Sequence, residues 1–368
     1  MNERWSHTPD GLARARGVGV EFPGIPGAWN AITDVPGIEV GVTTLIEGDN
    51  VRTGVTAIIP RRSDLGDPCA AGIHVLNGNG EMTGAAWIAE SGTMTGPVCI
   101  TNTHAVGVAH AGIVEWVADR HPELGESWLL PVVAETWDGM LHEINRQHLT
   151  TDHVVAALEA ATQGPVQEGS VGGGTGMVCY GYKGGNGTAS RLVEHGGETY
   201  TVGVFLQANF GRRDELTIRG RHLGASLPPD DGRPETAQGA GSVIVIVATD
   251  APLLPDQCRA LARRVTIGLA RTGTHGSHTS GDIFLALSTG NPGGFGANAD
   301  ALGEASRPLD RLEFVPWASI NPFFAAVVHA TEEAVVNALI ANRAMTGYRN
   351  HHVAAFPHDA LSSSHGAS

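Results

Sequence analysis

The stretch Gly241-Ser242-Val243-Ile244-Val245-Ile246-Val247 decides how the chain must fold. It follows a polar segment, residues 219–241, in which Pro and Gly recur without a period. The apolar residues do not alternate with polar ones, so both faces of a strand at 242–249 must be covered by other parts of the protein. The sequence therefore predicts a buried strand that begins at Ser242.

Working outward from this strand, apolar periodicity predicts strands and helices that alternate along the chain. The other predicted strands are 37–44, 55–60, 73–76, 98–101, 201–207 and 283–288. The predicted helices are 107–119, 138–147, 151–162, 255–271 and 331–345. In the last helix we expect Thr331 as the N-cap, with Glu332 and Glu333 in the first turn. The order predicts a layered α/β protein with sheets inside and helices outside.

Composition limits the classes of function. The 368 residues carry a formal net charge of −15, and the 23 Lys and Arg residues are scattered rather than gathered on one helix face. This pattern argues against nucleic acid or a membrane surface as a partner. Cys69, Cys99, Cys179 and Cys258 lie far apart, which is typical of buried thiols in a reducing compartment. With no signal peptide and no run of about 18 apolar residues, we expect a cytoplasmic protein.

Familiar motifs for cofactors, metals and other nucleophiles are absent from the sequence. Residues 171–176 are glycine-rich, but no Gly-Lys-Ser/Thr follows them and no G-x-G-x-x-G frame fits. No H-E-x-x-H occurs, and the spacing of His104 and His110 does not put them on one helix face. Ser242 also lacks the G-x-S-x-G context of an α/β-hydrolase nucleophile. We therefore expect neither a metal nor a cofactor.

The polar segment 219–241 has two interpretations. A segment this long without periodicity is uncommon inside a compact domain, and it indicates either a linker between domains or a functional loop. The strand that follows is fully buried, so it needs partners from earlier in the chain. We therefore expect a single domain, residues 1–368, with a processing loop that ends at Gly241.

Several segments taken together resemble the DmpA-type aminopeptidases. They are residues 77–84, 101–104, 134–139, 168–177, 183–185, 187–191, 241–242, 278–282 and 331–347. Each motif is short and unspecific alone, whereas their order and spacing are specific. The resemblance extends from about residue 14 to residue 347.

The resemblance implies a four-layer αββα sandwich similar to that of N-terminal-nucleophile hydrolases. It implies an L-aminopeptidase with D-amidase and D-esterase activity, related to β-peptidyl aminopeptidases. It also implies an inactive precursor that cuts itself between Gly241 and Ser242, giving an α chain of residues 1–241 and a β chain of residues 242–368. The expected substrates are small peptides, amides or esters with a free amino group, and the expected assembly is a homotetramer of αβ units.

Serine chemistry supports this reading of Ser242. A serine hydroxyl is a weak nucleophile until a base removes its proton. A freed α-amino group has a reference pKa of about 7.7–8.0, so part of it is neutral near pH 7 and can accept that proton directly or through one water. Before cleavage the same hydroxyl could attack the carbonyl of Gly241, which carries no side chain. A cut at this bond would create nucleophile and base together.

The resemblance also assigns roles to residues around Ser242. Ser280 is expected to relay protons and Asp282 to fix Ser280 or the new ammonium, although Ser-Gly-Asp alone is a common turn. Asn209 is expected to donate to the oxyanion, where one oriented donor can contribute several kcal/mol.

Two further residues are expected to bind substrate. Glu135 matches a carboxylate that pairs with the substrate's free ammonium; without the family it would be read as a solvated loop charge. Trp137 departs from the family, which often has tyrosine there, and an indole offers one N–H donor but no hydroxyl. Either the tyrosine's role has passed to Asn209 and backbone amides, or the pocket accepts different side chains.

Two alternatives remain open from the sequence. Ornithine acetyltransferases share the fold and the self-cleavage, but they use threonine where this chain has Ser242. An unprocessed, non-catalytic binding protein could also keep the fold. Beyond the resemblance, residues 348–368 are rich in His and Ser and are expected to form a loose tail.

Overall fold

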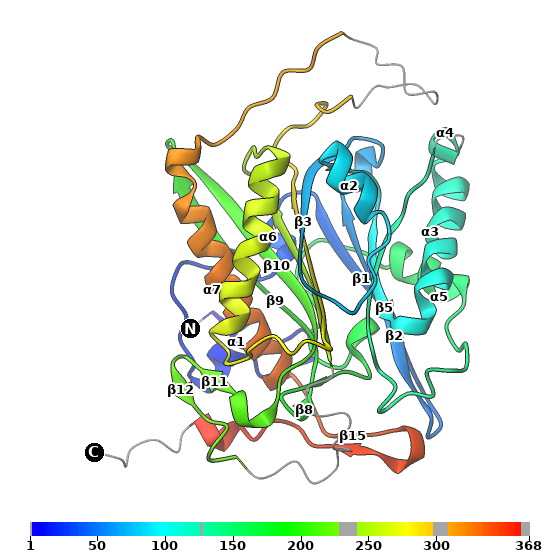
Figure 1. The fold of residues 1–368 in the computed structure, drawn as a ribbon, viewed down its shortest axis with the longest axis vertical. Helices are drawn as coiled ribbons and strands as arrows, with labels where there is room; N and C mark the ends of the chain where they lie inside the picture. Colours follow the sequence, from blue (N-terminus) through cyan, green and yellow to red (C-terminus); the bar gives the residue numbers. More distant parts are fainter. Residues whose placement is uncertain (1, 126–127, 228–240, 297–307, 362–368) are drawn as a thin grey trace.

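The computed structural model, which describes residues 2–125, 128–227, 241–296 and 308–361, contains two β-sheets packed face to face (Figure 1). The small sheet has the order β1 (Ile38–Glu47), β2 (Val51–Pro60), β5 (Val98–Asn102), β6 (Val132–Thr136). The large sheet has the order β4 (Thr93–Met94), β3 (Cys69–Gly78), β14 (Gly281–Ser288), β13 (Ser242–Thr249), β10 (Glu198–Asn209), β9 (Gly185–His195).

Helices cover the outer face of each sheet. Helices α3 (Val106–Arg120) and α5 (Thr151–Glu159) pack on the small sheet, and α6 (Pro255–Ala270) and α7 (Asn321–Ile340) pack on the large one (Figure 1). Three apolar cores fill the spaces between these four layers. Helix α7 is long and apolar enough to cross a membrane, but it packs against β9, β10 and α6 as a core helix. The predicted αββα sandwich is therefore confirmed.

Strand β13 lies inside the large sheet, as the apolar run predicted, and every one of its residues is buried. Val243 and Val245 pack toward the outer helices, whereas Ile244 and Ile246 pack between the two sheets. Because both faces are covered by apolar layers, the strand needs no alternation of polar and apolar residues.

Two helix predictions are wrong: that of a helix at 138–147, and the bounds 331–345 of the last helix, which in the structure is α7 (Asn321–Ile340). Residues 138–147 form turns rather than a helix. The carbonyl of Asp138 accepts the N–H of His142, but the next N–H group, that of Glu143, donates to the carbonyl of Asn50 and so leaves the helical pattern. Thr331 is not an N-cap either, since α7 already begins at Asn321 and Thr331 is buried in its middle. The acidic pair that suggested a first turn is instead neutralised by arginines inside the protein.

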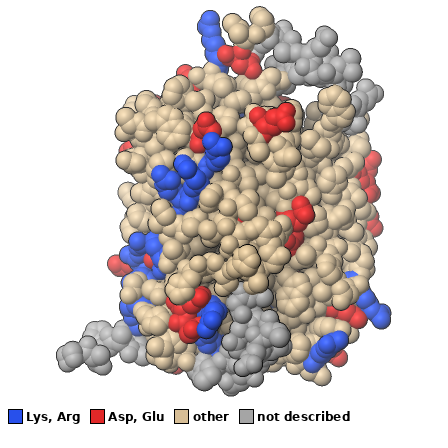
Figure 2. Space-filling view, in the orientation of Figure 1, with Lys and Arg blue, Asp and Glu red and all other residues tan. Residues whose placement is uncertain are grey.

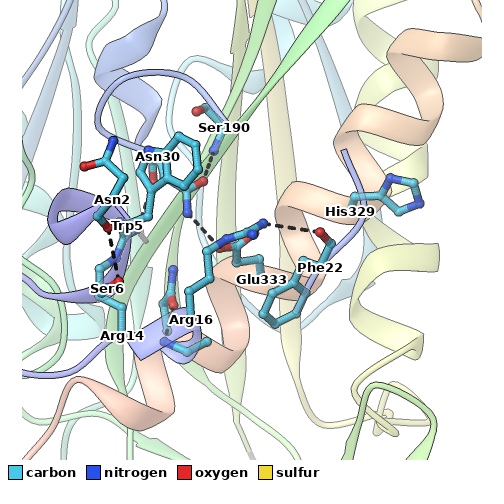
Figure 3. A network of polar contacts seen from close by, with 12 residues as sticks. Asn2, Trp5, Ser6, Arg14, Arg16, Phe22, Asn30, Ser190, His329 and Glu333 are labelled. Atoms are coloured by element: carbon cyan, nitrogen blue, oxygen red, sulfur yellow. Dashed lines mark hydrogen bonds and ion pairs between the residues drawn. The ribbon is translucent and has the colours of Figure 1, made fainter. Parts of the chain in front are cut away.

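Glu333 fixes α7 to segments that come much earlier in the chain (Figure 3). Its carboxylate accepts from Arg16 at 2.6 Å, from Arg191 at 2.6 Å and from Asn30 at 2.7 Å. Burial alone would raise the pKa of Glu333, but Arg191 and Arg16 outweigh it and hold that pKa below its ordinary value. Because Glu333 follows Ser242 in sequence and its partners precede it, this network would join the two pieces of a chain cut at Gly241.

The expected loose tail is wrong for residues 348–361, which the structure describes. Val353 is buried in β16 (His352–Val353), which pairs with β15 (Met345–Thr346). Phe356 packs edge-on against Tyr182 with 5.4 Å between ring centroids. These apolar contacts hold the segment on the protein. Residues 362–368 lie outside the described residues.

The remaining described elements are short. They are the helices α1 (Glu3–Ser6), α2 (Ala85–Ser91) and α4 (Pro122–Gly125), and the hairpins β7 (Val178–Cys179) with β8 (Tyr182–Lys183) and β11 (Thr217–Ile218) with β12 (Arg221–His222). On the face shown in Figure 2, acidic and basic side chains are scattered in small groups and form no basic stripe. Of the predicted processing loop, residues 228–240 lie outside the described residues.

Candidate active site

Ser242 is the first residue of β13, an interior strand of the large sheet. It pairs with Asn209 across the antiparallel β10–β13 ladder and with Gly281 across the parallel β13–β14 ladder. Its side chain is almost completely buried, at 3% exposure. The first residue of the central apolar run therefore lies between two of the segments that the sequence singled out.

Gly241 contacts the two strands beside β13, which are β14 and β10. Its carbonyl oxygen accepts the backbone N–H of Gly281, the first residue of β14, at 3.1 Å. A β-carbon at position 241 would overlap the carbonyl oxygen of Asn209 and would lie 3.0 Å from the Cα of Phe210. Glycine is thus the residue that fits here, and the Gly281 N–H is a donor already aimed at the carbonyl that Ser242 would attack.

Ser280 and Asp282 flank Gly281 and are joined to each other. The Ser280 hydroxyl donates to Asp282 Oδ1 at 2.6 Å, and the Asn77 side-chain amide donates to Asp282 Oδ2 at 2.9 Å. Burial raises the pKa of the Asp282 carboxyl, against the opposing effect of these two hydrogen bonds. Within the described part of the uncleaved chain, no hydrogen bond joins Ser242 to Ser280 or Asp282; the strand ladder alone sets their proximity.

Asn209 and Trp137 form the second side of the site. The side-chain amide of Asn209 donates to the carbonyl of Trp137 at 2.8 Å and accepts the N–H of Val178 at 2.9 Å. The backbone N–H of Trp137 donates to the Ser242 hydroxyl oxygen at 3.3 Å. The Trp137 side chain is 45% exposed. The backbone of Trp137 therefore contacts the serine, while its indole is open to solvent.

Glu135 is a buried strand residue and not a solvated loop charge. It lies in β6, where its carboxylate accepts the N–H of Glu81 at 2.9 Å and the hydroxyl of Thr103. Burial raises the pKa of this carboxyl, and the two hydrogen bonds oppose that effect. A β-carbon on Gly80 would lie 3.3 Å from Glu135 Oε1 and 3.1 Å from the Cα of Gly281. Only Gly80 therefore lies between the Glu135 carboxylate and Gly281, the residue of β14 that pairs with Ser242.

A buried glutamine connects the two sheets behind the site. Gln207 Nε2 donates to the carbonyl of Thr101 at 3.1 Å and to the hydroxyl of Thr136 at 2.7 Å. Gln207 belongs to the large sheet, whereas Thr136 is the last residue of β6 and Thr101 the last but one of β5 in the small sheet. This bridge fixes the end of β6, from which Glu135 and Trp137 extend.

The structure thus brings together Gly241, Ser242, Asn209 and Trp137, places Ser280 and Asp282 on the adjacent strand, and holds Glu135 one layer away. Sequence reasoning missed Gln207, whose only signal was a polar residue inside an apolar strand. It also missed Asp138, which is fully buried and whose carboxyl has its pKa raised by desolvation to about 8. Among the described residues, no cluster of three His, Cys, Asp or Glu side chains could hold a metal ion.

This arrangement suits acyl transfer through a serine. A buried hydroxyl adjoins a carbonyl that is held by a backbone donor, and an oriented amide stands on its other side, which are the parts that such a reaction needs. The carboxylate of Glu135, which is separated from Gly281 by Gly80, could receive a cationic group of the substrate.

Comparisons with known proteins agree with one another. The model of peptidase family S58 matches residues 30–353. The β-peptidyl aminopeptidase BapA of Sphingosinicella microcystinivorans is 45% identical over 369 residues, which cover 95% of this chain and 90% of that protein.

Two solved structures are also similar. One is the L-aminopeptidase D-Ala-esterase/amidase of Ochrobactrum anthropi, described as a prototype for the serine aminopeptidases and a new variant of the Ntn-hydrolase fold. It gives a TM-score of 0.88 at 45% identity, covering 95% of this chain and 96% of that one. A Burkholderia β-aminopeptidase gives 0.87 at 43% identity, covering 96% and 100%. The resemblance seen in the sequence is confirmed.

Proposed function

The chain belongs to peptidase family S58 and is a hydrolase of the aminopeptidase type, and we propose that its nucleophile is Ser242, freed by self-cleavage after Gly241. The observation that carries this proposal is the position of the Gly241–Ser242 bond. The carbonyl of Gly241 accepts the backbone N–H of Gly281, and the buried hydroxyl of Ser242 accepts the backbone N–H of Trp137.

In the proposed reaction the Ser242 hydroxyl attacks the Gly241 carbonyl carbon, and the Gly281 N–H stabilises the resulting oxyanion. The carbon–nitrogen bond then breaks, and the serine nitrogen takes a proton and becomes a free amine. Water hydrolyses the ester that remains. We expect Asp282, which accepts the Ser280 hydroxyl and pairs with Val243 in the β13–β14 ladder, to stabilise the new ammonium.

In turnover the freed amine removes the proton of the Ser242 hydroxyl, which attacks the substrate carbonyl. Asn209 Nδ2 and the backbone N–H of Trp137 lie beside the serine and would donate hydrogen bonds to the oxyanion that forms on the substrate. Glu135 binds the substrate's ammonium. An acyltransferase of the ornithine acetyltransferase type is not favoured, because the chain has serine at position 242 and its relatives are named as aminopeptidases.

For substrates we propose peptides, amides and esters with a free amino group, including those with an amino-terminal β-residue. The support is the similarity to the β-peptidyl aminopeptidases. A homotetramer of αβ units and a cytoplasmic location are also proposals, and light scattering of the purified protein tests the first. Comparing β-alanyl and L-alanyl p-nitroanilides tests the β-residue preference.

The decisive variant is Ser242→Ala, with Ser63→Ala as a matched control on an exposed serine. We expect Ser242→Ala to stay a single chain on a denaturing gel and to lose hydrolysis of L-alanyl p-nitroanilide, while circular dichroism shows a folded protein. Ser63→Ala should split and work like the parent. A Ser242→Ala protein that still hydrolyses the substrate would remove Ser242 from the reaction.

A further inference from the structure

Lys183 stands apart from every other basic residue. The chain contains 23 lysines and arginines, and Lys183 is the only lysine among them. Its side chain is fully buried, at 0% exposure. A cationic side chain is almost never buried completely unless it is paired. All other basic residues of this kind are arginines, so the single lysine of the chain lies at a position that solvent does not reach.

A tight hairpin puts Lys183 next to the site. Strands β7 and β8 pair with Val178 opposite Lys183, and the turn between them is Tyr180-Gly181, with φ of 51° and 73°. A tyrosine at positive φ is uncommon and needs local support. The Tyr180 hydroxyl lies 2.7 Å from the hydroxyl of Thr272, and its backbone N–H donates to the carbonyl of Phe210. Both contacts fix the turn of the hairpin.

The ammonium end of Lys183 is bound by two backbone carbonyls. Nζ donates to the carbonyl of Met177 at 2.7 Å and to that of Gly184 at 2.8 Å. Burial lowers the pKa of Lys183 to about 7, while the ionisable groups of Cys179 and Asp138 act in the opposite direction. Both the neutral amine and the ammonium carry enough N–H groups for these two bonds.

One peptide unit connects Lys183 to Asn209. The Met177 carbonyl that accepts from Lys183 belongs to the same peptide plane as the N–H of Val178. That N–H donates to Asn209 Oδ1 at 2.9 Å, and Asn209 Nδ2 in turn donates to the Trp137 carbonyl beside Ser242. The contacts form one chain of hydrogen bonds that all run in the same direction, from the buried amine to the amide in the site.

We propose that Lys183 is a positioning residue that orients and polarises the side-chain amide of Asn209 through the Met177–Val178 peptide. A donor on the Met177 carbonyl makes the Val178 N–H a stronger donor, and this in turn strengthens donation by Asn209, because aligned hydrogen bonds polarise one another. The backbone N–H of Gly184 also donates to the Met177 carbonyl at 2.9 Å. Loss of the lysine amine therefore weakens this chain of hydrogen bonds, while the Met177–Val178 peptide stays in place.

This inference rests on the proposed role of Asn209 as an oxyanion donor in substrate turnover. Self-cleavage uses a different donor, since the Gly241 carbonyl is held by the Gly281 N–H. Removing the Lys183 amine should therefore slow turnover much more than maturation. A general loss of structure would slow both.

A double-mutant cycle tests the connection. Removing one oxyanion donor typically lowers kcat by roughly 100- to 1,000-fold, and we expect Lys183→Met to lower kcat about ten-fold through a weakened Asn209, with KM unchanged. In the Asn209→Ala background, Lys183→Met should have no further effect on kcat, because its route to the oxyanion is gone. Losses that multiply in the double variant would overturn the role of Lys183. Full kcat in Asn209→Ala alone would instead overturn the role of Asn209 itself.

The single lysine permits a second measurement that needs no change at position 183. Protein labelled with ¹³Cε-lysine gives one lysine resonance, whose pH titration reports Lys183 directly. Coupling between two sites is reciprocal, so Asn209→Ala should lower the pKa of Lys183 by weakening the Met177 carbonyl as an acceptor. Glu90→Gln, at an exposed position of α2, should leave the titration unchanged. An identical titration in the parent and in Asn209→Ala would contradict the proposal.

Discussion

The backbone N–H of Trp137 lies 3.3 Å from the hydroxyl oxygen of Ser242. The carbonyl of the same residue accepts from Asn209, the partner of Ser242 in the β10–β13 ladder. The main chain of Trp137 is thus hydrogen-bonded to the side chains of both Ser242 and Asn209. The contacts of this residue with the serine do not depend on its side chain.

Replacing the Trp137 side chain should therefore spare maturation and affect substrate binding. We expect Trp137→Ala to self-cleave at the parental rate, while its KM for L-alanyl p-nitroanilide rises about five-fold, since an exposed aromatic contact contributes about 1 kcal/mol. Gel-based cleavage kinetics and initial rates measure the two effects. Trp128→Ala, which removes an indole that is 83% exposed, is the matched control and should change neither. A Trp137→Ala chain that remains uncleaved would contradict the backbone role.

Gly241→Ala should impair self-cleavage by strain. Its β-carbon would overlap the Asn209 carbonyl oxygen, which belongs to a paired strand and cannot move away cheaply. Overpacking of this kind costs about 1–3 kcal/mol, so cleavage should slow by about 5- to 160-fold. Gly107→Ala is the matched control, because a β-carbon there meets nothing within 4 Å. Parental cleavage in Gly241→Ala would show that close packing at this bond does not matter.

Glu135→Gln should weaken binding of substrates that carry a free amine. Glutamine keeps one oxygen for the N–H of Glu81, and its amide NH2 can donate to the Thr103 hydroxyl, but it loses the charge that would face an ammonium. Breaking a buried charge pair costs at least about 2 kcal/mol, which corresponds to a KM about 30-fold higher. An N-acetylated ester should be hydrolysed within about two-fold of the parental rate, as should both substrates in the exposed control Glu90→Gln. Equal losses on amine and N-blocked substrates would refute the role.

Asp138 should make stability depend on pH. Its pKa is raised from 3.8 to about 8, chiefly by desolvation, so the folded protein keeps a proton that the unfolded chain releases above pH 4. This contribution is fully present below pH 4 and is lost as pH rises toward 8, at roughly 1.4 kcal/mol per pH unit. Asp138→Asn mimics the protonated form, so its free energy of unfolding should lack that slope. Compared with the parent, the variant should therefore gain stability between pH 5 and pH 8.

Urea unfolding from pH 5 to pH 8 measures the difference, with both proteins in the single-chain Ser242→Ala background. Asp49→Asn, on an exposed loop, should follow the parent at every pH. Parallel curves for Asp138→Asn and the parent would mean that Asp138 is ionised in the folded protein.

The apolar run after Ser242 predicted the buried central strand, and the order of strands and helices along the chain predicted the layered fold. The cut after Gly241 was predicted from the family resemblance and stays a prediction. An unalternating run fixes burial on both faces, and burial on both faces requires layers on each side. The grouping of Asn209, Ser280 and Asp282 around Ser242 came from the family resemblance, because strand pairing between distant segments has no local signal in the sequence. Their actual hydrogen bonds required the structure.

The parts that escaped prediction have specific physical causes. Strand β9 is rich in glycine and contains Arg191, and it is buried only because Gly187 allows α7 to approach and Glu333 neutralises the arginine. Strand β6 is short and follows a proline, so Glu135 looked like a loop residue. In both cases tertiary contacts outweigh local propensity.

Intact-mass spectrometry of the purified protein tests the central claim most directly. Self-cleavage after Gly241 predicts two masses, one of them the fragment of residues 242–368 with a free serine amine at its start, and aminopeptidase activity that appears as the uncut mass disappears. A fully active protein with the single mass of the 38.3 kDa chain would contradict it.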